Sequence, residues 1–419
     1  MRKPKLFESR SELLLFGLVM LLLILGRLGW EYHRYKRFVA KPFYYTYATV
    51  LNIYKRQKGN RSYTVLKLQS GEGLRFYTTT HSKKVLDHTY LRLQIFPDKR
   101  IGFWDYLGTF YVKSRIKECK RLPKTAQESL GRRIAVQHSD SRMGALYNAI
   151  FLALPLPHTL RESIAALGVS HLVALSGFHL SILWGVLYGL LLLPYKALQQ
   201  RYFPYRYALI DVGAVVMMLL GVYVLFVGTP PSLLRSYAMV LVGWLALLLG
   251  LELVSFTFLA AVFAILTLLF PSLLVSLSFW FSVAGVFYIF LLLHYTKALH
   301  PWLIMLLVIP VGIFILMLPI VHGIFGVTTP YQLLSPILSL LFIPFYPLTF
   351  LLHLVEMGDL FDPLLQWLFT LPKESSKMLL PWWMVAGYIA LSLGAIRYRV
   401  FFYATLLLAS VYAVYLFIA

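Results

Sequence analysis

The sequence predicts a polytopic α-helical membrane protein that carries a small all-β, OB-like barrel domain on the extracytoplasmic side. Hydrophobic residues make up 59% of the 419 residues. Apolar runs of about 18 to 22 residues, the length that crosses a bilayer, recur along the chain. One early segment instead alternates short β-rich runs with turn residues. Most of the net charge of +22 also falls on that segment.

Residues 1–30 are expected to form an N-terminal transmembrane anchor. The first apolar run, Leu13 to Leu28, follows a basic cluster that includes Arg2 and Lys3. It is longer than the apolar core of a signal peptide, and no cleavage site of the small-x-small type follows it. We therefore expect this span to be retained.

Residues 40–115 are expected to form the barrel. Short runs rich in Tyr, Thr, Val and Phe are separated by turn residues, and the breaks Lys58 to Arg61 and Ser70 to Gly73 suit hairpins. Five strands in about 70 residues predict an OB-like barrel, although an SH3-like barrel would read similarly. The predicted strands are Phe43 to Tyr54, Ser62 to Gln69, Leu74 to Thr80, Tyr90 to Phe96 and Gly108 to Lys113.

Residues 116–145 are expected to be a basic linker with helices at the membrane surface, where anionic headgroups attract Lys and Arg. Beyond it, residues 146–419 form a multi-span domain. The predicted spans are Ile164 to Leu193, Tyr207 to Val227, Leu233 to Leu249, Phe256 to Phe270, Leu273 to His294, Trp302 to Ile320, Leu333 to Val355, Leu379 to Ile396 and Val400 to Ile418.

Short loops rich in Lys and Arg prefer the cytoplasm. The N-terminus, the loop Lys196 to Arg206 and the loop around Lys297 are therefore expected inside, which leaves the basic barrel outside. The proline-rich segment Pro330 to Pro363 is expected to be a re-entrant or broken helix.

The basic barrel is a candidate binding domain for single-stranded nucleic acid. From Arg27 to Ala145 there are 25 Lys and Arg against 8 Asp and Glu. Cations neutralise phosphates and aromatic rings stack bases. Attachment to anionic lipid, or a merely solvated surface, would explain the same charges. The candidate cations, whose loops could together form a stripe, are Lys55, Arg56, Lys58, Arg61, Lys83, Lys84, Lys99 and Arg100.

Two polar insertions interrupt the apolar spans. In Ser170 to Leu183, His171 and His179 would lie about 80° apart on a continuous helix. Ser176 and Gly177 between them could unwind it, and a broken helix at membrane depth indicates a pathway. Hydrogen bonding of both histidines to neighbouring helices is the alternative.

The second insertion is the segment Gly228 to Ser236, in which prolines precede Arg235. An arginine so close to a span usually faces water, a partner or an anion. Snorkelling of the guanidinium to an interface is the alternative.

These insertions resemble motifs of the ComEC competence proteins. The stretch "LGVSHLVALSGFHLSIL", Leu167 to Leu183, is similar to the family signature. "PSLLRSYAM", Pro231 to Met239, and "LSFWFSVAG", Leu277 to Gly285, are similar to two further family segments in the same order. The resemblance covers essentially the whole chain.

The resemblance implies a bacterial inner-membrane channel that passes one DNA strand into the cytoplasm during natural transformation. The implied partners are single-stranded DNA, the lipid bilayer, an extracytoplasmic DNA receptor and a cytoplasmic helicase-like ATPase. The residues carried over as a channel motif are His171, Ser176, Gly177, His179, Pro231, Ser232 and Arg235.

No enzymatic activity and no cofactor are expected. The chain reaches Ala419 without a metallo-β-lactamase-like domain, so strand degradation is expected to fall to another protein. No G-x-x-x-x-G-K-[ST] loop for ATP is present. Cys119 is the single cysteine, which excludes a disulfide or a thiolate metal cage within one chain.

Two rival classes remain open. An intramembrane serine hydrolase would use Ser176 as nucleophile with His294 or His322 as base. A membrane-anchored polyanion-binding module would need only one span, and the repeated polar breaks argue against it.

Overall fold

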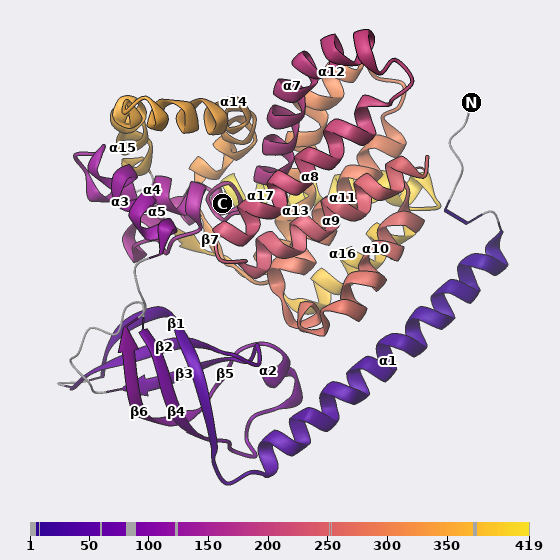
Figure 1. Ribbon diagram of the computed structural model, residues 1–419. Helices are drawn as coiled ribbons and strands as arrows, with labels where there is room; N and C mark the ends of the chain where they lie inside the picture. The colour runs from indigo at the N-terminus through magenta and orange to yellow at the C-terminus, as the bar shows by residue number, and fades with distance from the viewer. Residues whose placement is uncertain are drawn as a thin grey trace. The chain divides into compact units, whose positions relative to one another are not determined.

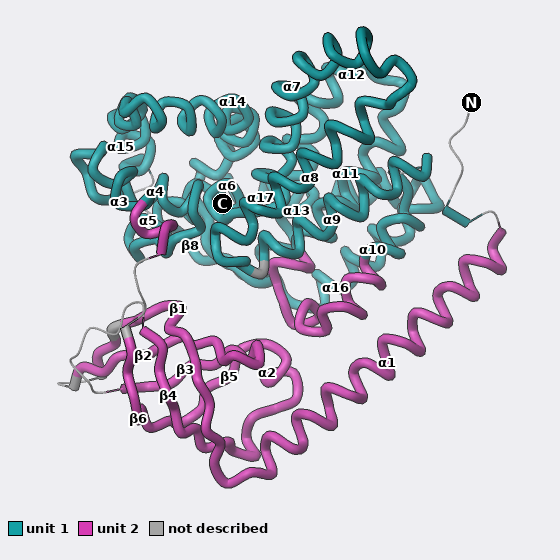
Figure 2. Tube along the Cα trace, viewed as in Figure 1, with its two compact units in different colours: residues 1–8, 130–262, 281–419 teal, residues 9–129, 263–280 magenta. Residues whose placement is uncertain are grey.

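The computed structural model describes the chain apart from residues 1–5, 8, 59–60, 81–88, 122–124, 251, 253, 372–374 and 419. The chain is mostly helical, with a small N-terminal sheet (Figure 1). Within the described residues, seven helices are long and apolar enough to cross a membrane. The chain divides into a sheet unit, residues 9–129 and 263–280, and a helical unit that holds the remainder (Figure 2).

In the sheet unit, helix α1 extends from Arg10 to Ala40, ten residues beyond the predicted anchor. The Ser9 hydroxyl caps it by accepting the Glu12 N–H at 3.2 Å. Leucines of its first half are exposed, as a lipid-facing surface requires. In its last turns Phe38 is buried in the core of the sheet domain, and the Tyr35 hydroxyl donates to the Ile101 carbonyl at 2.8 Å. The apolar helix therefore continues directly into the folded domain.

Six strands form one mixed sheet. Strands β3 and β5 pair in parallel, and the other neighbours are antiparallel. The strand order is β5-β3-β2-β1-β4-β6. The elements are β1 (Tyr44–Lys58), β2 (Arg61–Ser70), β3 (Arg75–Thr80), β4 (Thr89–Phe96), the short helix α2 (Phe103–Leu107), β5 (Phe110–Tyr111) and β6 (Lys113–Arg121).

The sheet has an apolar inner face and a polar outer face, as period-2 alternation requires. On β4, Leu91, Leu93 and Ile95 are buried, so that Tyr90 and Arg92 face outward. Residues opposite one another on neighbouring strands share a face, and the pairing thus fixes which side chains of β1, β2 and β3 are also outward.

One expectation for this domain needs correction, and strand pairing leaves a second one unconfirmed. Residues 116–121, predicted as linker, are the end of β6, which pairs with β4. The run of Lys and Arg suggested a linker because, from Lys117 to Lys120, every side chain of this strand is exposed. Strand pairing also does not close a barrel, because β5 and β6 stand at the two ends of the strand order. These two strands are nevertheless consecutive in the chain, separated by Val112 alone.

The predicted spans of the multi-span domain coincide with helices, with two exceptions. The span Leu273 to His294 is divided between η1 (Pro271–Val275) and α11 (Leu277–Tyr295). The first predicted span, Ile164 to Leu193, is broken into three helices. The helical elements are α3 (Ala126–Val136), α4 (Ser141–Leu152), α5 (His158–Ala166), α6 (Ser170–Val173), α7 (Gly177–Tyr202), α8 (Ala208–Phe226), α9 (Pro231–Leu248), α10 (Phe256–Leu269), η1 (Pro271–Val275), α11 (Leu277–Tyr295), α12 (Pro301–Leu303), η2 (Ile304–Val308), α13 (Ile309–His322), η3 (Pro330–Leu334), α14 (Ser335–Leu354), η4 (Gly358–Phe361), α15 (Asp362–Thr370), α16 (Trp382–Gly394) and α17 (Arg399–Ile418).

A two-stranded ribbon joins the segment before α14 to the segment after α15. Strand β7 (Val327–Thr328) pairs antiparallel with β8 (Ser376–Lys377), and the Met378 N–H donates to the Gly326 carbonyl at 2.8 Å. The excursion through α14 and α15 therefore starts and finishes at one place, as a re-entrant segment does. Helix α14 is not broken at its prolines, because it continues through Pro344 and Pro347.

Candidate functional site

The signature segment begins where α5 ends in a Schellman turn. The Val169 N–H donates to the Ile164 carbonyl at 3.2 Å, and the Gly168 N–H donates to the Ala165 carbonyl at 3.0 Å. Gly168 has φ +69°, and a Cβ there would lie 3.3 Å from Cγ of Gln332. Both the left-handed backbone and the close approach of η3 require glycine at this position.

The helix break predicted at Ser176 and Gly177 is present. Helix α6 ends at Val173, and α7 begins at Gly177 after an extended Ser176 with φ −142°. Ser176 makes no side-chain cap, and its Oγ instead lies 3.4 Å from Nδ1 of His179. The first N–H groups of α7 thus have no side-chain acceptor from Ser176.

His171 contacts α14 through a ladder of serine hydroxyls. Its Nε2 lies 3.1 Å from Oγ of Ser339, which donates to the Ser335 carbonyl at 2.7 Å. The Ser335 hydroxyl donates to the Gly168 carbonyl at 3.2 Å. The side chain of His171 is exposed, whereas Ser335 is buried. This ladder joins the signature segment to the first turns of α14.

His179 lies in packed protein and not in an open passage. It is 0% exposed, and its ring meets Phe342 and Tyr346 of α14 edge to face, with centroids 5.1 and 5.0 Å away. Its Nε2 has no hydrogen-bond partner among the described residues. Because the helix is broken, both histidines contact the same helix, α14, although 80° would have separated them on a continuous one.

The second polar insertion adjoins the first. Gly228 and Thr229 have φ +83° and +51° and end α8, so that α9 starts at Pro231. A Cβ on Gly177 would lie 3.5 Å from Oγ of Ser236, which follows Arg235 in α9. Arg235 is only 5% exposed. The N-terminal turns of α7 and α9 therefore come together.

The structure describes fewer contacts for Ser232 and Pro231, the other two predicted residues of that insertion. Ser232 is half-buried, and its carbonyl accepts the Ser236 hydroxyl at 2.8 Å. The side chain of Pro231 lies outside the described part of the chain.

The structure does not assemble the hydrolase site with the base that the rival hypothesis named. His322 uses Nδ1 on the Leu318 carbonyl and Nε2 on the Thr328 hydroxyl, each at 3.0 Å. The ring of His294 lies against Phe256 and Tyr295. The imidazole beside Ser176 is instead that of His179. In the described residues no cluster of three His, Cys, Asp or Glu is arranged to hold a metal ion.

The stripe of loop cations stays a prediction, and the described residues place two of its clusters at opposite ends of β1. The hairpin that pairs Lys58 with Arg61 lies at the end of β1, whereas Lys99 and Arg100 follow β4, which ends beside the start of β1. Strand β1 separates these two clusters by about 40 Å. Arg56, Lys99 and Arg100 are exposed. Lys83 and Lys84, and the side chains of Lys55, Lys58 and Arg61, lie outside the described residues.

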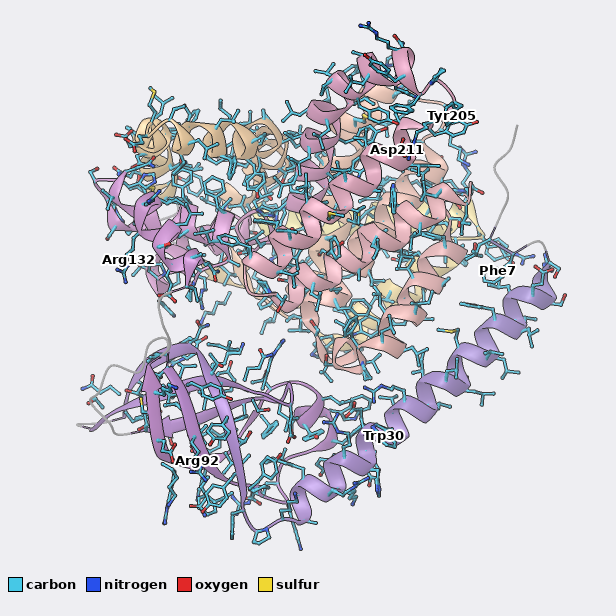
Figure 3. The ribbon with its side chains drawn as sticks, in the orientation of Figure 1. Phe7, Trp30, Arg92, Arg132, Tyr205 and Asp211 are labelled. Carbon is cyan, nitrogen blue, oxygen red and sulfur yellow. The ribbon has the colours of Figure 1, made fainter. Side chains whose placement is uncertain are left out.

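An aromatic and cationic surface lies between those ends, on the outer face of the sheet. The rings of Tyr47 and Tyr90 stack at 5.4 Å with 5° between their planes. The guanidinium of Arg92 lies 5.8 and 5.9 Å from the rings of Tyr45 and Tyr47, and it bonds Glu118 at 2.7 Å (Figure 3). Tyr45 is 49% and Tyr47 46% exposed. These rings are available to a ligand.

The same face continues onto β2 and β3. Lys67 lies opposite Tyr77 with its ammonium 5.8 Å from that ring, and Arg75 lies on the next outward position of β3. Burial, followed by the charge of Arg75, lowers the pKa of Lys67, and burial lowers the pKa of Arg75. No described acidic side chain pairs with either cation. We define the outer sheet face as Tyr45, Tyr47, Lys67, Arg75, Tyr77, Tyr90 and Arg92.

Sequence reasoning missed both this face and the role of α14, although each carries a signal. Alternation along β1 and β4 separates Tyr45, Tyr47 and Arg92 from the apolar positions. On α14, Ser335, Ser339, Phe342 and Tyr346 follow the helical spacing of one face.

Comparison with protein families gives one match, to the family described as competence protein, over residues 155–418. In the comparisons with curated proteins and with solved structures, nothing matches. The matched region is more than half of the chain, and it contains the signature segment, the α9 insertion and α14. The chain belongs to the ComEC family of competence proteins, which act in DNA uptake during transformation.

Proposed function

We propose that this protein conducts single-stranded DNA across the bacterial cytoplasmic membrane, with the sheet domain capturing the strand and the helical unit conducting it. The observation that carries the proposal is the outer sheet face. Stacked tyrosines beside cations suit a chain of bases and phosphates of any sequence. Cationic loops alone would suit lipid equally well.

We infer an OB-like barrel from the edges of the sheet. Strands β5 and β6 stand at opposite ends of the strand order yet are consecutive in the chain. The Val112 N–H between them donates to the Tyr77 carbonyl at 2.9 Å, and the hydroxyls of Thr78 and Ser114 lie 2.7 Å apart. These bonds link β3 to both edge strands, and this supports a curled, nearly closed sheet of the kind that binds single strands.

An extracytoplasmic position for the sheet domain follows from counting helices. Helix η1 belongs to the sheet unit, where it packs against α1 and α2. Eight helices, α3 to α10, lie between the two parts in the chain, and we propose that α7, α8 and the shorter apolar helices α9 and α10 cross the membrane. Four crossings return the chain to the side where it started. The loops that contain Lys196 and Lys297 then fall inside, in keeping with the charge bias of short loops.

The neighbouring starts of α7 and α9 are the proposed point at which phosphates approach the membrane. Helix N-termini attract anions, and Arg235 adds a positive charge one turn into α9. Helix α14 covers this region through His171 and His179. We therefore propose that α14 is a gate, which must separate from α7 before a strand can pass.

The proposed partners remain those of the family resemblance. An extracytoplasmic receptor delivers DNA to the sheet domain, and a cytoplasmic helicase-like ATPase draws the strand in. The absence of an ATP-binding loop in the sequence is why we place the energy source in another protein.

The test compares tyrosines on and off the outer sheet face. The full chain in lipid nanodiscs is titrated with a labelled single-stranded oligonucleotide, followed by fluorescence anisotropy. Loss of one base–tyrosine stack costs about 1 to 3 kcal/mol, so Tyr45→Ala and Tyr47→Ala should each weaken binding by about fivefold to about 150-fold.

The matched control is Tyr205→Ala, a 76% exposed tyrosine that belongs to the helical unit and not to the sheet. It should bind as the parent protein does. If Tyr45→Ala and Tyr47→Ala also bind like the parent, the outer sheet face is not the strand-binding surface. Undiminished association with anionic vesicles would then favour lipid attachment.

A further inference from the structure

Two histidines and an aspartate far apart in the chain meet at the end of α14 opposite to the signature segment. His138, which follows α3, has Nδ1 2.9 Å from Oδ2 and 3.0 Å from Oδ1 of Asp362. Its Nε2 lies 3.1 Å from Nε2 of His353, the last basic residue of α14. His138 is 8% and Asp362 4% exposed. We call these three residues the triad.

The hydrogen-bond partners fix how many protons the triad holds. His353 Nδ1 lies 2.7 Å from the Thr349 carbonyl, which only accepts, so this nitrogen carries a hydrogen. The contact between Nε2 of His138 and Nε2 of His353 requires one hydrogen, carried by either ring. The contact between Nδ1 of His138 and the Asp362 carboxyl requires another, carried by either group. Every arrangement that satisfies all three contacts holds one proton more than a carboxylate with two neutral imidazoles.

We propose that the triad is a buried proton-binding site whose proton fastens the turn between α14 and α15 to the segment that follows α3. Without that proton, the lone pairs of His138 and His353 face each other at 3.1 Å, and the contact becomes repulsive. Protonation of the triad thus determines whether the C-terminal end of α14 stays bound to the segment that follows α3.

The surroundings of the triad disfavour an ionised Asp362 without a proton donor. Tyr147 of α4 stacks on His138 at 4.8 Å with 9° between the planes and lies 4.6 Å from His353. The titratable groups that face the triad are Tyr147 and Asp359 of η4. Burial raises the pKa of the Asp362 carboxyl above its ordinary value, which disfavours a lone carboxylate there.

Two hydrogen bonds of Gln137 at the same end of α14 provide a signal that can be measured. Gln137 donates from Nε2 to the His353 carbonyl at 3.1 Å and accepts the Gly358 N–H on Oε1 at 3.1 Å. A Cβ on Gly358 would lie 2.5 Å from that oxygen, so the two segments are in direct contact. Release of the triad should expose the Gly358 amide and the rest of η4 to solvent.

The test is hydrogen–deuterium exchange of the full chain in lipid nanodiscs from about pH 5 to about pH 8. Exchange times are scaled for the pH dependence of the chemical exchange rate. If opening releases one proton, it becomes about tenfold easier for each unit of pH in the range where the closed triad holds that proton and the open one does not. Protection of Gly358 to Phe361 should therefore fall as pH rises.

Asp362→Asn separates the proposal from a purely structural role. The asparagine amide donates to Nδ1 of His138, which leaves its Nε2–H to donate to His353, so all contacts persist without the extra proton. Protection of η4 should then be high and nearly independent of pH. His353→Leu should remove the protection at every pH.

His158→Gln is the matched control, because exposed His158 pairs with Glu162 at 3.4 Å on α5, apart from the triad. It should follow the parent curve. Protection of η4 that ignores pH in the parent, or that falls with pH equally in Asp362→Asn, would overturn the proposal. The exchange test does not depend on DNA transport. Only the consequence for gating by α14 rests on the proposed function.

Discussion

The outer sheet face and the signature segment differ in what stands between their functional groups and a ligand. Nearly half of the surface of Tyr45 and Tyr47 is exposed. His179 and Arg235, by contrast, are 0% and 5% exposed, and α14 supplies the rings that cover His179. If the proposed function holds, capture of a strand needs no rearrangement of the sheet, whereas passage requires that α14 move.

The contacts by which α14 covers the signature segment contribute only a modest free energy. Each edge-to-face contact of His179 with Phe342 or Tyr346 is worth about 0.5 to 1.5 kcal/mol. The bond from His171 to Ser339 adds about 1 kcal/mol. Several stacked bases, at about 1 to 3 kcal/mol each, would together exceed a cost of this size. The comparison thus predicts that changes at α14 alter transport, while changes on the sheet alter binding.

The largest effect should come from tethering α14 to the signature segment. His171→Cys with Ser339→Cys, in a Cys119→Ser background, joined by a short reducible crosslinker, should abolish import of labelled DNA and leave surface binding unchanged. Import is measured as nuclease-protected label in cells. Reduction should restore it, and each single cysteine variant serves as control. Full import through the tethered protein would refute gating by α14.

Reversal of the buried charge should have nearly as large an effect on transport. Arg235→Glu places an anion at the adjoining starts of α7 and α9, where phosphates are proposed to approach. Import should fall to background with strand binding unaltered, and Arg235→Lys should retain part of it. Arg206→Glu, at an exposed arginine paired with Asp211, is the control. Normal import by Arg235→Glu would remove this residue from the path.

A smaller effect is expected at the cations of the sheet domain. Removal of one cation that binds a phosphate should reduce the slope of log affinity against log salt by about 0.7. Lys67→Gln and Arg75→Gln lie on the outer sheet face and should each reduce the slope. Charge reversal of Lys55, Arg56, Lys58 and Arg61 tests the distant hairpin. If only the hairpin variants change the slope, the strand follows the loops and not the face.

The smallest expected effect is a loss of affinity for single-stranded DNA at alkaline pH. Burial and the charge of Arg75 lower the pKa of free Lys67, and a bound phosphate should raise it again. Binding therefore takes up protons, and affinity should fall as pH rises through the lowered pKa of Lys67. Oligonucleotide titrations at rising pH measure this fall, and Lys67→Gln should flatten it. A fall of the same size in Lys67→Gln would assign the titration to another group.

Much of the fold could be predicted, because local patterns determine it. Apolar runs located the spans, and the polar content of the run with Ser176 and Gly177 was enough to indicate a break there. Strand β6 was missed because its Lys and Arg suggested a linker, while its alternation became meaningful only through pairing with β4. The end of α1 was misplaced because its last turns pack on the sheet instead of on lipid.

The candidate site was predictable only in part, because local sequence patterns do not indicate which distant segments come into contact. The sequence pointed to His171 and His179, but not to Ser339, Phe342 and Tyr346, which lie more than 160 residues away. The triad likewise joins positions 138, 353 and 362. Asp362, one of three acids between two apolar stretches, was a signal that a partner existed.

The central claim, that single-stranded DNA moves α14 away from α7, can be measured directly as a distance. Spin labels at Leu341→Cys on α14 and Leu190→Cys on α7, both at exposed positions, in a Cys119→Ser background report it by double electron–electron resonance. Addition of a single-stranded oligonucleotide should shift the distance distribution to longer values, and duplex DNA of the same length should not. A distribution that saturating single-stranded DNA leaves unchanged would contradict the account.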